Sequence, residues 1–200
     1  MGRLVDLDDL RAALTRPARP SSDYDLNPEF ALPETRKLRP AAVLVVIAEG
    51  AQGAEVILTK RASHLKHHPG QIAFPGGKVD EGDADAVDAA LREAEEEIGL
   101  PRSHASVIGQ MPPHETVTGY EVTPVLAVLK GVFDPVSEPG EVAEVFRAPL
   151  GVLMDPNAYR VEGRRWRGVW RRFYVVPYGP YYIWGATARM LKSLADRVAR

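Results

Sequence analysis

Residues 76–100 carry the most informative pattern in the chain and read GGKVDEGDADAVDAALREAEEEIGL. Apolar residues recur there at steps of three and four, which predicts a helix over residues 83–98 with one face in the core. That face contains Ala84, Val87, Leu91, Ala94 and Ile98. Gly99 and Pro101 are stop signals that predict the end of the helix. At about 100° per residue, three glutamates fall together on another side of this helix: Glu93, Glu96 and Glu97.

This glutamate cluster is unfavourable for the stability of the helix itself. No basic residue stands four positions after any of its members, and Glu93 and Glu97 form a like-charge pair that costs about 0.2–0.5 kcal/mol. The helix dipole disfavours each anion near the C-terminal end by about 0.3–1 kcal/mol. Two explanations remain open: a solvated helix face, or a divalent cation held by the carboxylates. Oxygen ligands of this kind suit Mg²⁺ or Mn²⁺.

The remaining sequence predicts an α/β or α+β layered domain. Apolar runs predict strands at residues 41–48, 55–61, 106–111, 120–129, 142–147 and 169–176. A final helix is expected over residues 184–198. Strands mixed with two well-separated helices indicate a sheet that is covered by helices.

We expect two parts in the chain. Residues 1–37 are expected to form an N-terminal helix, over about residues 5–15, and an extended arm, because five prolines lie between positions 16 and 40. The compact domain is expected to occupy residues 38–200. A monomer and a homodimer both remain open.

The overall composition excludes several classes of partner. The 200 residues hold 25 Lys+Arg and 27 Asp+Glu, a net charge of −2, which argues against binding nucleic acid or an anionic membrane through bulk charge. The longest apolar run, residues 41–48, is far shorter than the roughly 20 residues of a membrane-spanning helix, so we expect no membrane association. The absence of cysteine excludes disulfides and Cys-ligated metal sites. Without a signal-peptide pattern, a cytoplasmic location is expected.

The order of residues around the acidic helix resembles the Nudix box, a Gly followed downstream by Arg-Glu-apolar-x-Glu-Glu-x-Gly-apolar. The chain has Gly77 and then REAEEEIGL at residues 92–100. It departs from the general box at Asp83, where a Glu is usual, and by one extra residue between Gly77 and Arg92. The resemblance implies a Nudix fold, with a mixed β-sheet sandwiched between helices. It also implies hydrolysis of a nucleoside diphosphate that is linked to another group.

The same resemblance implies a metal-dependent active site. Glu93, Glu96 and Glu97 are expected to hold Mg²⁺ or Mn²⁺. Glu96 and Glu97 are also expected to act in catalysis, and Arg92 is expected to orient the carboxylates. The proton acceptor is expected either in the box or in a loop. Candidates outside the box, each of which is also explained as a solvent-facing residue, are Glu115, Glu141 and Glu144, and of these we favour Glu144.

The segment before the box resembles the signature of the coenzyme A pyrophosphatase subgroup. It reads ILTKRASHLKHHPGQIAFPGG over residues 57–77, with Lys66 where the subgroup has Arg. Arg61 and Lys66 are expected to neutralise the diphosphate or the 3′-phosphate of coenzyme A, unless they form an ordinary solvated strand end and loop. Gly76 and Gly77 are expected to let the backbone approach a phosphate, although such a pair is more often a simple turn.

Together these resemblances imply metal-dependent cleavage of coenzyme A or acyl-CoA to 3′,5′-ADP and (acyl-)4′-phosphopantetheine. Alternative substrates for the same fold are ADP-ribose, dinucleotides and capped RNA. An alternative of a different class is a non-catalytic domain that binds a nucleotide.

A basic segment follows later in the chain. Residues 160–172 contain six arginines and one acid, with Trp166 and Trp170 among them, whereas residues 78–97 contain nine acids and two bases. Three interpretations of the basic segment remain open: it stacks on and neutralises nucleic acid, it binds the adenine and 3′-phosphate of coenzyme A, or it is the solvated face of a twisted hairpin. The expected partner is a small molecule, without nucleic acid.

Overall fold

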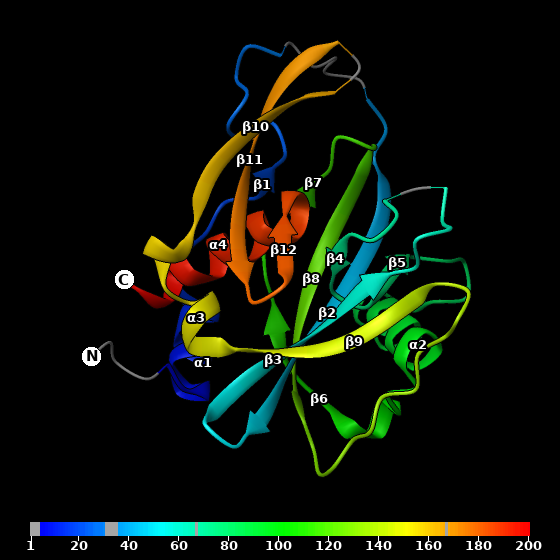
Figure 1. The fold of residues 1–200 in the computed structure, drawn as a ribbon. Coiled ribbons are helices and arrows are strands. Elements are labelled where there is room, and N and C mark those ends of the chain that lie inside the picture. The colour runs from blue at the N-terminus through cyan, green and yellow to red at the C-terminus, as the bar shows by residue number, and fades with distance from the viewer. Residues whose placement is uncertain (1–4, 31–35, 67, 167) are drawn as a thin grey trace.

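The computed structural model of the protein describes residues 5–30, 36–66, 68–166 and 168–200 (Figure 1). The helices are α1 Leu7–Thr15, α2 Ala86–Ile98, α3 Leu150–Leu153 and α4 Gly185–Val198. The first strands are β1 Ser21–Ser22, β2 Arg39–Gly50, β3 Gly53–Arg61, β4 Ile72–Ala73, β5 Gly76–Lys78 and β6 Ala105–Gln110. The later strands are β7 His114–Glu115, β8 Tyr120–Leu129, β9 Val142–Pro149, β10 Arg160–Trp166, β11 Val169–Tyr178 and β12 Tyr181–Trp184.

The larger of two sheets is mixed. Its strands are ordered β1-β7-β8-β2-β3-β4, while β5, β6 and β9 pair with β2, β8 and β3 respectively. The central strands β2 and β8 run parallel, with Leu44 opposite Val125, whereas β2 and β3 form an antiparallel hairpin. The second sheet, β10-β11-β12, is antiparallel and extends above the larger one in Figure 1. None of the helices in the described ranges is long and apolar enough to cross a membrane.

Burial of β2 on both faces explains the unbroken apolar run at residues 41–48. One set of its side chains packs in the layer of α2, and the alternate set packs in the layer that contains α1 and α4. The first set is Ala42, Leu44, Val46 and Ala48, and the second is Ala41, Val43, Val45 and Ile47. A strand covered on both faces needs apolar residues at consecutive positions. The predicted Nudix fold, a mixed sheet between helices, is confirmed.

Helix α2 begins later than the apolar pattern predicts. The Asp85 side chain caps its N-terminus by accepting hydrogen bonds from the backbone N–H groups of Val87 at 2.8 Å and Asp88 at 2.9 Å. Ala84 therefore lies outside the helix and is exposed, so its assignment to the core face was wrong. Gly99 ends the helix with φ 70°, a left-handed conformation that glycine adopts without steric cost.

The described part of the N-terminal segment packs on the domain. In α1, Leu10 and Ala13 are fully buried in the same core as α4. The Arg197 side chain of α4 donates to the carbonyl oxygens of Leu14 and Arg16, both at 3.0 Å, and so closes the end of α1. Strand β1 pairs in parallel with β7. These contacts join the segment to α4 and to the larger sheet, and the boundary at residue 38 stays a prediction.

Candidate active site

Strand β5 brings the glycine pair against the acidic helix. The Gly76 N–H donates to Glu97 Oε2 at 3.2 Å. A Cβ atom at Gly77 would lie 2.6 Å from the Glu93 carboxyl carbon, and one at Gly76 would lie 2.6 Å from the Val43 Cα atom. The two glycines thus permit close packing of β5 on α2 and β2. The Glu93 carboxylate occupies the space beside Gly77. Binding of phosphate by Gly76 and Gly77 stays a prediction.

Glu97 is the most buried carboxylate of the cluster, with a side chain that is 4% exposed. Burial raises its pKa to about 8, against the opposing effects of the Gly76 N–H and the Arg61 charge. The Arg61 guanidinium lies 3.9 Å from Glu97 Oε1. The negative charges of Glu93 and Glu141 raise this pKa further. A carboxyl group with its pKa raised in this way stays largely protonated at neutral pH, and a bound cation would favour its ionised form.

Arg92 supplies a countercharge to the carboxylates around it. Its guanidinium forms two hydrogen bonds with Asp83, both 2.9 Å, and donates to Glu93 Oε1 at 3.1 Å and Glu96 Oε2 at 3.0 Å. These contacts lower the pKa of Asp83 to about 2. Burial raises the pKa of Glu93, whose side chain is 15% exposed, whereas that of Glu96 is 60% exposed. Arg92, which directly precedes Glu93 in the chain, thus holds the carboxylates of Glu93 and Glu96 in place.

The donor chemistry of the cluster fits a hard divalent cation. Within the described part of the chain, no three His, Cys, Asp or Glu side chains already converge as a metal site. The available donors are carboxylate oxygens, and the pKa values of Glu93 and Glu97 are both raised by burial. Carboxylate oxygens are the ligands of Mg²⁺ and Mn²⁺. Glu93 and Glu97 are the more buried members of the cluster and Glu96 is at the solvent edge, and their role as metal ligands stays a prediction.

The structure does not bring Glu144 to this cluster. Its carboxylate accepts a hydrogen bond from the Tyr181 hydroxyl. Glu144 also pairs across strands with Lys60, on the sheet face that carries Phe146 and that lies opposite α2. Glu115 is held by Arg36 through two hydrogen bonds of 2.6 Å.

Glu141 is the candidate from outside the helix that lies near the cluster. Its charge contributes to the raised pKa of both Glu93 and Glu97. Its carbonyl oxygen accepts from the Ala62 N–H at 2.8 Å, next to Arg61. The register irregularity between Lys60 and Arg61 occurs at this point of the β3–β9 pair, and strand periodicity alone does not reveal it.

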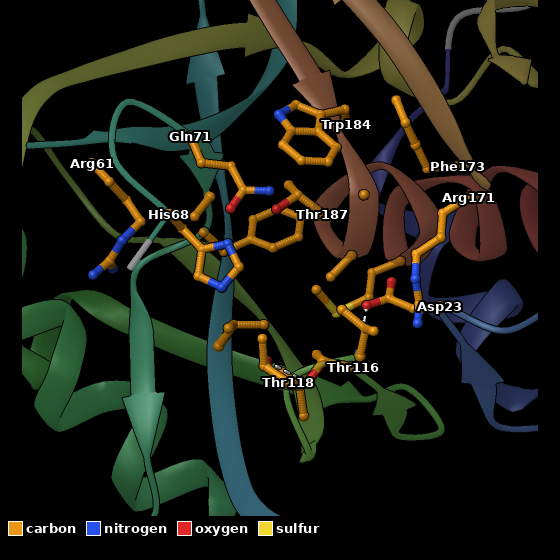
Figure 2. Close-up of a pocket in the computed structure, with 18 of the residues that line it drawn as sticks. Asp23, Arg61, His68, Gln71, Thr116, Thr118, Arg171, Phe173, Trp184 and Thr187 are labelled. Carbon is orange, nitrogen blue, oxygen red and sulfur yellow. Dashed lines mark hydrogen bonds between the residues drawn. The ribbon is translucent and has the colours of Figure 1, made fainter. Parts of the chain in front are cut away.

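A pocket of about 800 Å³ adjoins the carboxylates through Arg61. Figure 2 shows it between the loop with His68 and Gln71, the loop with Thr116 and Thr118, and the start of α4. Arg61 and Lys66 line it, and their contact with substrate phosphates stays a prediction, whereas Gly76 and Gly77 are absent from its described lining. Three arginines of the basic segment also line it: Arg164, Arg171 and Arg172. Arg167 of this segment lies outside the described residues.

Sequence reasoning missed the contribution of the N-terminal segment to the pocket. Asp23 and Asn27 both line it. The Asn27 side chain is buried, accepts from the Arg172 N–H at 2.8 Å and donates to the Arg172 carbonyl oxygen at 2.9 Å. Trp184 and Phe173 form part of another wall, with ring centroids 5.0 Å apart. No local pattern indicates that Asp23 and Asn27 face a pocket, because residues more than 140 positions away complete it.

The fold and this site define a class of protein. The NUDIX domain model matches residues 37–170, two-thirds of the chain. The chain belongs to the Nudix family. Members of this family hydrolyse diphosphate bonds in nucleotide-type small molecules and typically use a divalent metal ion, and the chain is assigned to that general activity.

Individual relatives support this membership. The chain is 43% identical over 165 residues to an uncharacterized Nudix hydrolase, NudL, of Escherichia coli K12, covering 82% of this chain and 85% of that protein. It is 42% identical over the same length to NudL of Shigella boydii, with the same coverage. The crystal structure of a MutT/nudix family protein from Enterococcus faecalis covers 98% of this chain and 76% of that chain, with a TM-score of 0.51 at 16% identity. That likeness supports the fold alone.

Proposed function

We propose that this protein hydrolyses the diphosphate of coenzyme A or acyl-CoA to 3′,5′-ADP and (acyl-)4′-phosphopantetheine, with Mg²⁺ or Mn²⁺. One observation carries the proposal: Arg61 both lines the 800 Å³ pocket and approaches the buried Glu97 carboxylate. A diphosphate held by this guanidinium would lie beside the acidic helix, while the remainder of a large nucleotide occupies the pocket. The upstream segment that resembles the coenzyme A pyrophosphatase subgroup contributes Arg61, Lys66 and Gln71 to the same lining.

Each residue has a defined task in this reaction. Glu93 and Glu97 would hold the metal ion, with Glu96 at the outer edge, and Arg92 holds Glu93 and Glu96 in place. When bound, the ion supplies charge that stabilises the developing negative charge on the diphosphate and favours ionisation of water. Water attacks one phosphorus, the bond from that phosphorus to the bridging oxygen breaks, and the departing phosphate takes the electron pair.

The proton of the attacking water passes to a carboxylate. Glu97 is one candidate, and Glu141 takes the place that the sequence assigned to Glu144, because the charge of Glu141 reaches the helix carboxylates. We expect Glu141→Gln to lower kcat about 100-fold or more, the range for loss of a general base. Glu144→Gln is the matched substitution three residues further along the chain and is expected to leave kcat within about threefold. The reverse result would restore Glu144 as the base.

The substrate assignment is tested by steady-state kinetics on purified protein. With Mg²⁺ or Mn²⁺, coenzyme A is expected to give a higher kcat/KM than ADP-ribose. Equal or faster turnover of ADP-ribose would refute the assignment to coenzyme A but leave the hydrolase intact. Absence of hydrolysis with coenzyme A, ADP-ribose, dinucleotides and capped RNA would favour a nucleotide-binding domain instead.

The catalytic helix is tested by a matched pair of substitutions. Glu97→Gln is expected to lower kcat at least 100-fold, since the variant loses a charged ligand at the centre of the cluster. Glu95→Gln is the control, because Glu95 is half exposed on another side of α2, with Arg102 3.6 Å away. It is expected to stay within about twofold of the wild type. Unchanged turnover in Glu97→Gln would refute the site.

A further inference from the structure

Two arginines stand directly opposite each other on the wall of the pocket. The register of β10 and β11 pairs Arg164 with Arg171, and both side chains line the cavity. Like charges at directly opposed positions of an antiparallel pair destabilise the sheet. An anion bound at this wall of the pocket would reduce the repulsion between these two residues.

Aromatic rings hold both guanidinium groups. The Arg164 Cζ atom lies 4.1 Å from the Trp184 ring centroid, and the Arg171 Cζ atom lies 4.6 Å from that of Phe30. Stacking of this kind fixes the guanidinium plane and leaves N–H groups at its edges for a ligand. Arg164 forms no salt bridge with a carboxylate of the described residues. The neighbouring Arg172 differs, because its guanidinium lies 3.3 Å from a Glu29 oxygen.

The described lining of the pocket contains more cations than anions. Asp23 is the one carboxylate among the lining residues that the structure describes. Its oxygens already accept from the Val117 N–H at 2.8 Å and lie 3.2 Å from His114 Nε2. Lysine and arginine side chains therefore outnumber this carboxylate in the described lining, and the pocket as a whole favours an anionic ligand.

Arg164 and Arg171 lie apart from Arg61, the arginine beside the acidic helix. Figure 2 shows Arg61 and Arg171 at opposite sides of the pocket, with His68, Gln71 and Thr187 between them. A diphosphate at Arg61, next to Glu97, leaves Arg164 and Arg171 for a second anionic group of the same molecule.

We propose that Arg164 and Arg171 bind a phosphate monoester of the substrate that is distinct from the diphosphate. This inference rests on the proposed function, in which that group is the 3′-phosphate of coenzyme A. A phosphate monoester carries a charge of about −1.5 to −2 at pH 7 and accepts bidentate hydrogen bonds from guanidinium groups. The pair therefore determines specificity: it favours coenzyme A over the analogue that lacks the 3′-phosphate.

The test combines two substrates with matched variants. The kcat/KM ratio of coenzyme A to 3′-dephospho-coenzyme A is measured for the wild type, Arg164→Gln and Arg165→Gln. Arg165 is the control because it neighbours Arg164 on β10, points to the opposite sheet face and does not line the pocket. We expect a ratio of about 10 to 100 in the wild type and in Arg165→Gln, and a fall toward 1 in Arg164→Gln, mainly through KM. Arg164→Lys, which keeps the charge without the fork, is expected to recover part of the ratio.

Product binding gives a second readout that needs no turnover. By calorimetry, 3′,5′-ADP is expected to bind the wild type at least tenfold more tightly than AMP, and Arg164→Gln is expected to lose this difference. A wild-type ratio near 1, or an equal loss for both substrates in Arg164→Gln, would overturn the inference while leaving hydrolysis of coenzyme A intact. If the wild type hydrolyses other diphosphates but not coenzyme A, the proposed function fails instead, and the inference fails with it.

Discussion

The close approach of Gly77 to Glu93 makes Gly77→Ala a direct test of the carboxylate geometry. The added Cβ atom would lie 2.6 Å from the Glu93 carboxyl carbon, whereas ordinary contacts begin at 3.4 Å. The carboxylate therefore has to move by about 0.8 Å, several times the roughly 0.2 Å tolerance of a metal–ligand distance. Misplacement on this scale costs about 100-fold in rate. We expect kcat to fall by about that factor and the Mg²⁺ concentration for half-maximal activity to rise.

Stability is expected to change little in this variant. Gly77 lies outside the left-handed region, and the atom in the way belongs to a side chain. Loss of the glycine stabilises by about 0.4–1 kcal/mol through the unfolded chain, which offsets part of the cost of displacing Glu93. Gly76→Ala behaves differently, since its Cβ would meet the backbone of β2, 2.6 Å from the Val43 Cα atom. That variant is expected to lose stability together with activity.

The assay is a Mg²⁺ titration of initial rates, combined with thermal denaturation. Gly82→Ala is the matched control, because a Cβ there has no neighbour within 4 Å. We expect it to keep wild-type kinetics. If Gly77→Ala retained kcat within twofold at every Mg²⁺ concentration, Glu93 would not need its observed position, and the assignment of Glu93 as a ligand would be refuted.

Three further outcomes are expected. Since the folded-state pKa of Glu97, about 8, lies above its ordinary value of 4.5, its contribution to stability without metal is complete below pH 4.5 and is lost as pH rises through 8. In EDTA, the free energy of unfolding of the wild type should fall by roughly 2 kcal/mol between pH 6 and 8 relative to that of Glu97→Gln. Mg²⁺ should bind the wild type more tightly as pH rises. The same pH dependence of unfolding in the two proteins would contradict this. Asn27→Ala leaves the Arg172 N–H without its buried acceptor and should lower the free energy of unfolding in urea by roughly 2–3 kcal/mol. It should also raise KM more than it lowers kcat. An unchanged KM would mean that the pocket wall formed by Asp23 and Asn27 does not bind substrate. Leu10→Ala should cost about 2–5 kcal/mol, because this fully buried side chain joins α1 to the main core; a loss below about 1 kcal/mol would show that α1 contributes little to folding.

Local patterns predicted the regular elements well. The strand at residues 120–129 matches β8, Tyr120–Leu129, and the final helix matches α4 to within one residue. These elements alternate or repeat their apolar residues at the period of the structure they form. The start of α2 was misplaced because Ala84 continues the apolar period by chance. Capping by Asp85 and the bond between Asp83 and Arg92 determine where the chain turns into the helix.

Some residues of the candidate site could be predicted from the sequence, and others could be placed only by the structure. Glu93, Glu96 and Glu97 are adjacent on one helix, so their spacing alone placed them together. The preference for Glu144 over Glu141 had no firm basis in the sequence, because the choice depends on a register irregularity where β9 meets β3. Alternation along β9 then sends Glu144 to the far face of the sheet, beside Tyr181.

The sequence by itself determined the family, the acidic helix and the carboxylates that suit a divalent cation, because this information lies within one short stretch of chain. Only the tertiary structure decided what surrounds that helix. The pocket joins Asp23 near the N-terminus, the loop after Arg61 and the hairpin with Arg164 and Arg171, which contact one another only after the two sheets have packed. Long-range packing also buries Glu97 and so raises its pKa, and a bound cation would stabilise the ionised form that burial disfavours.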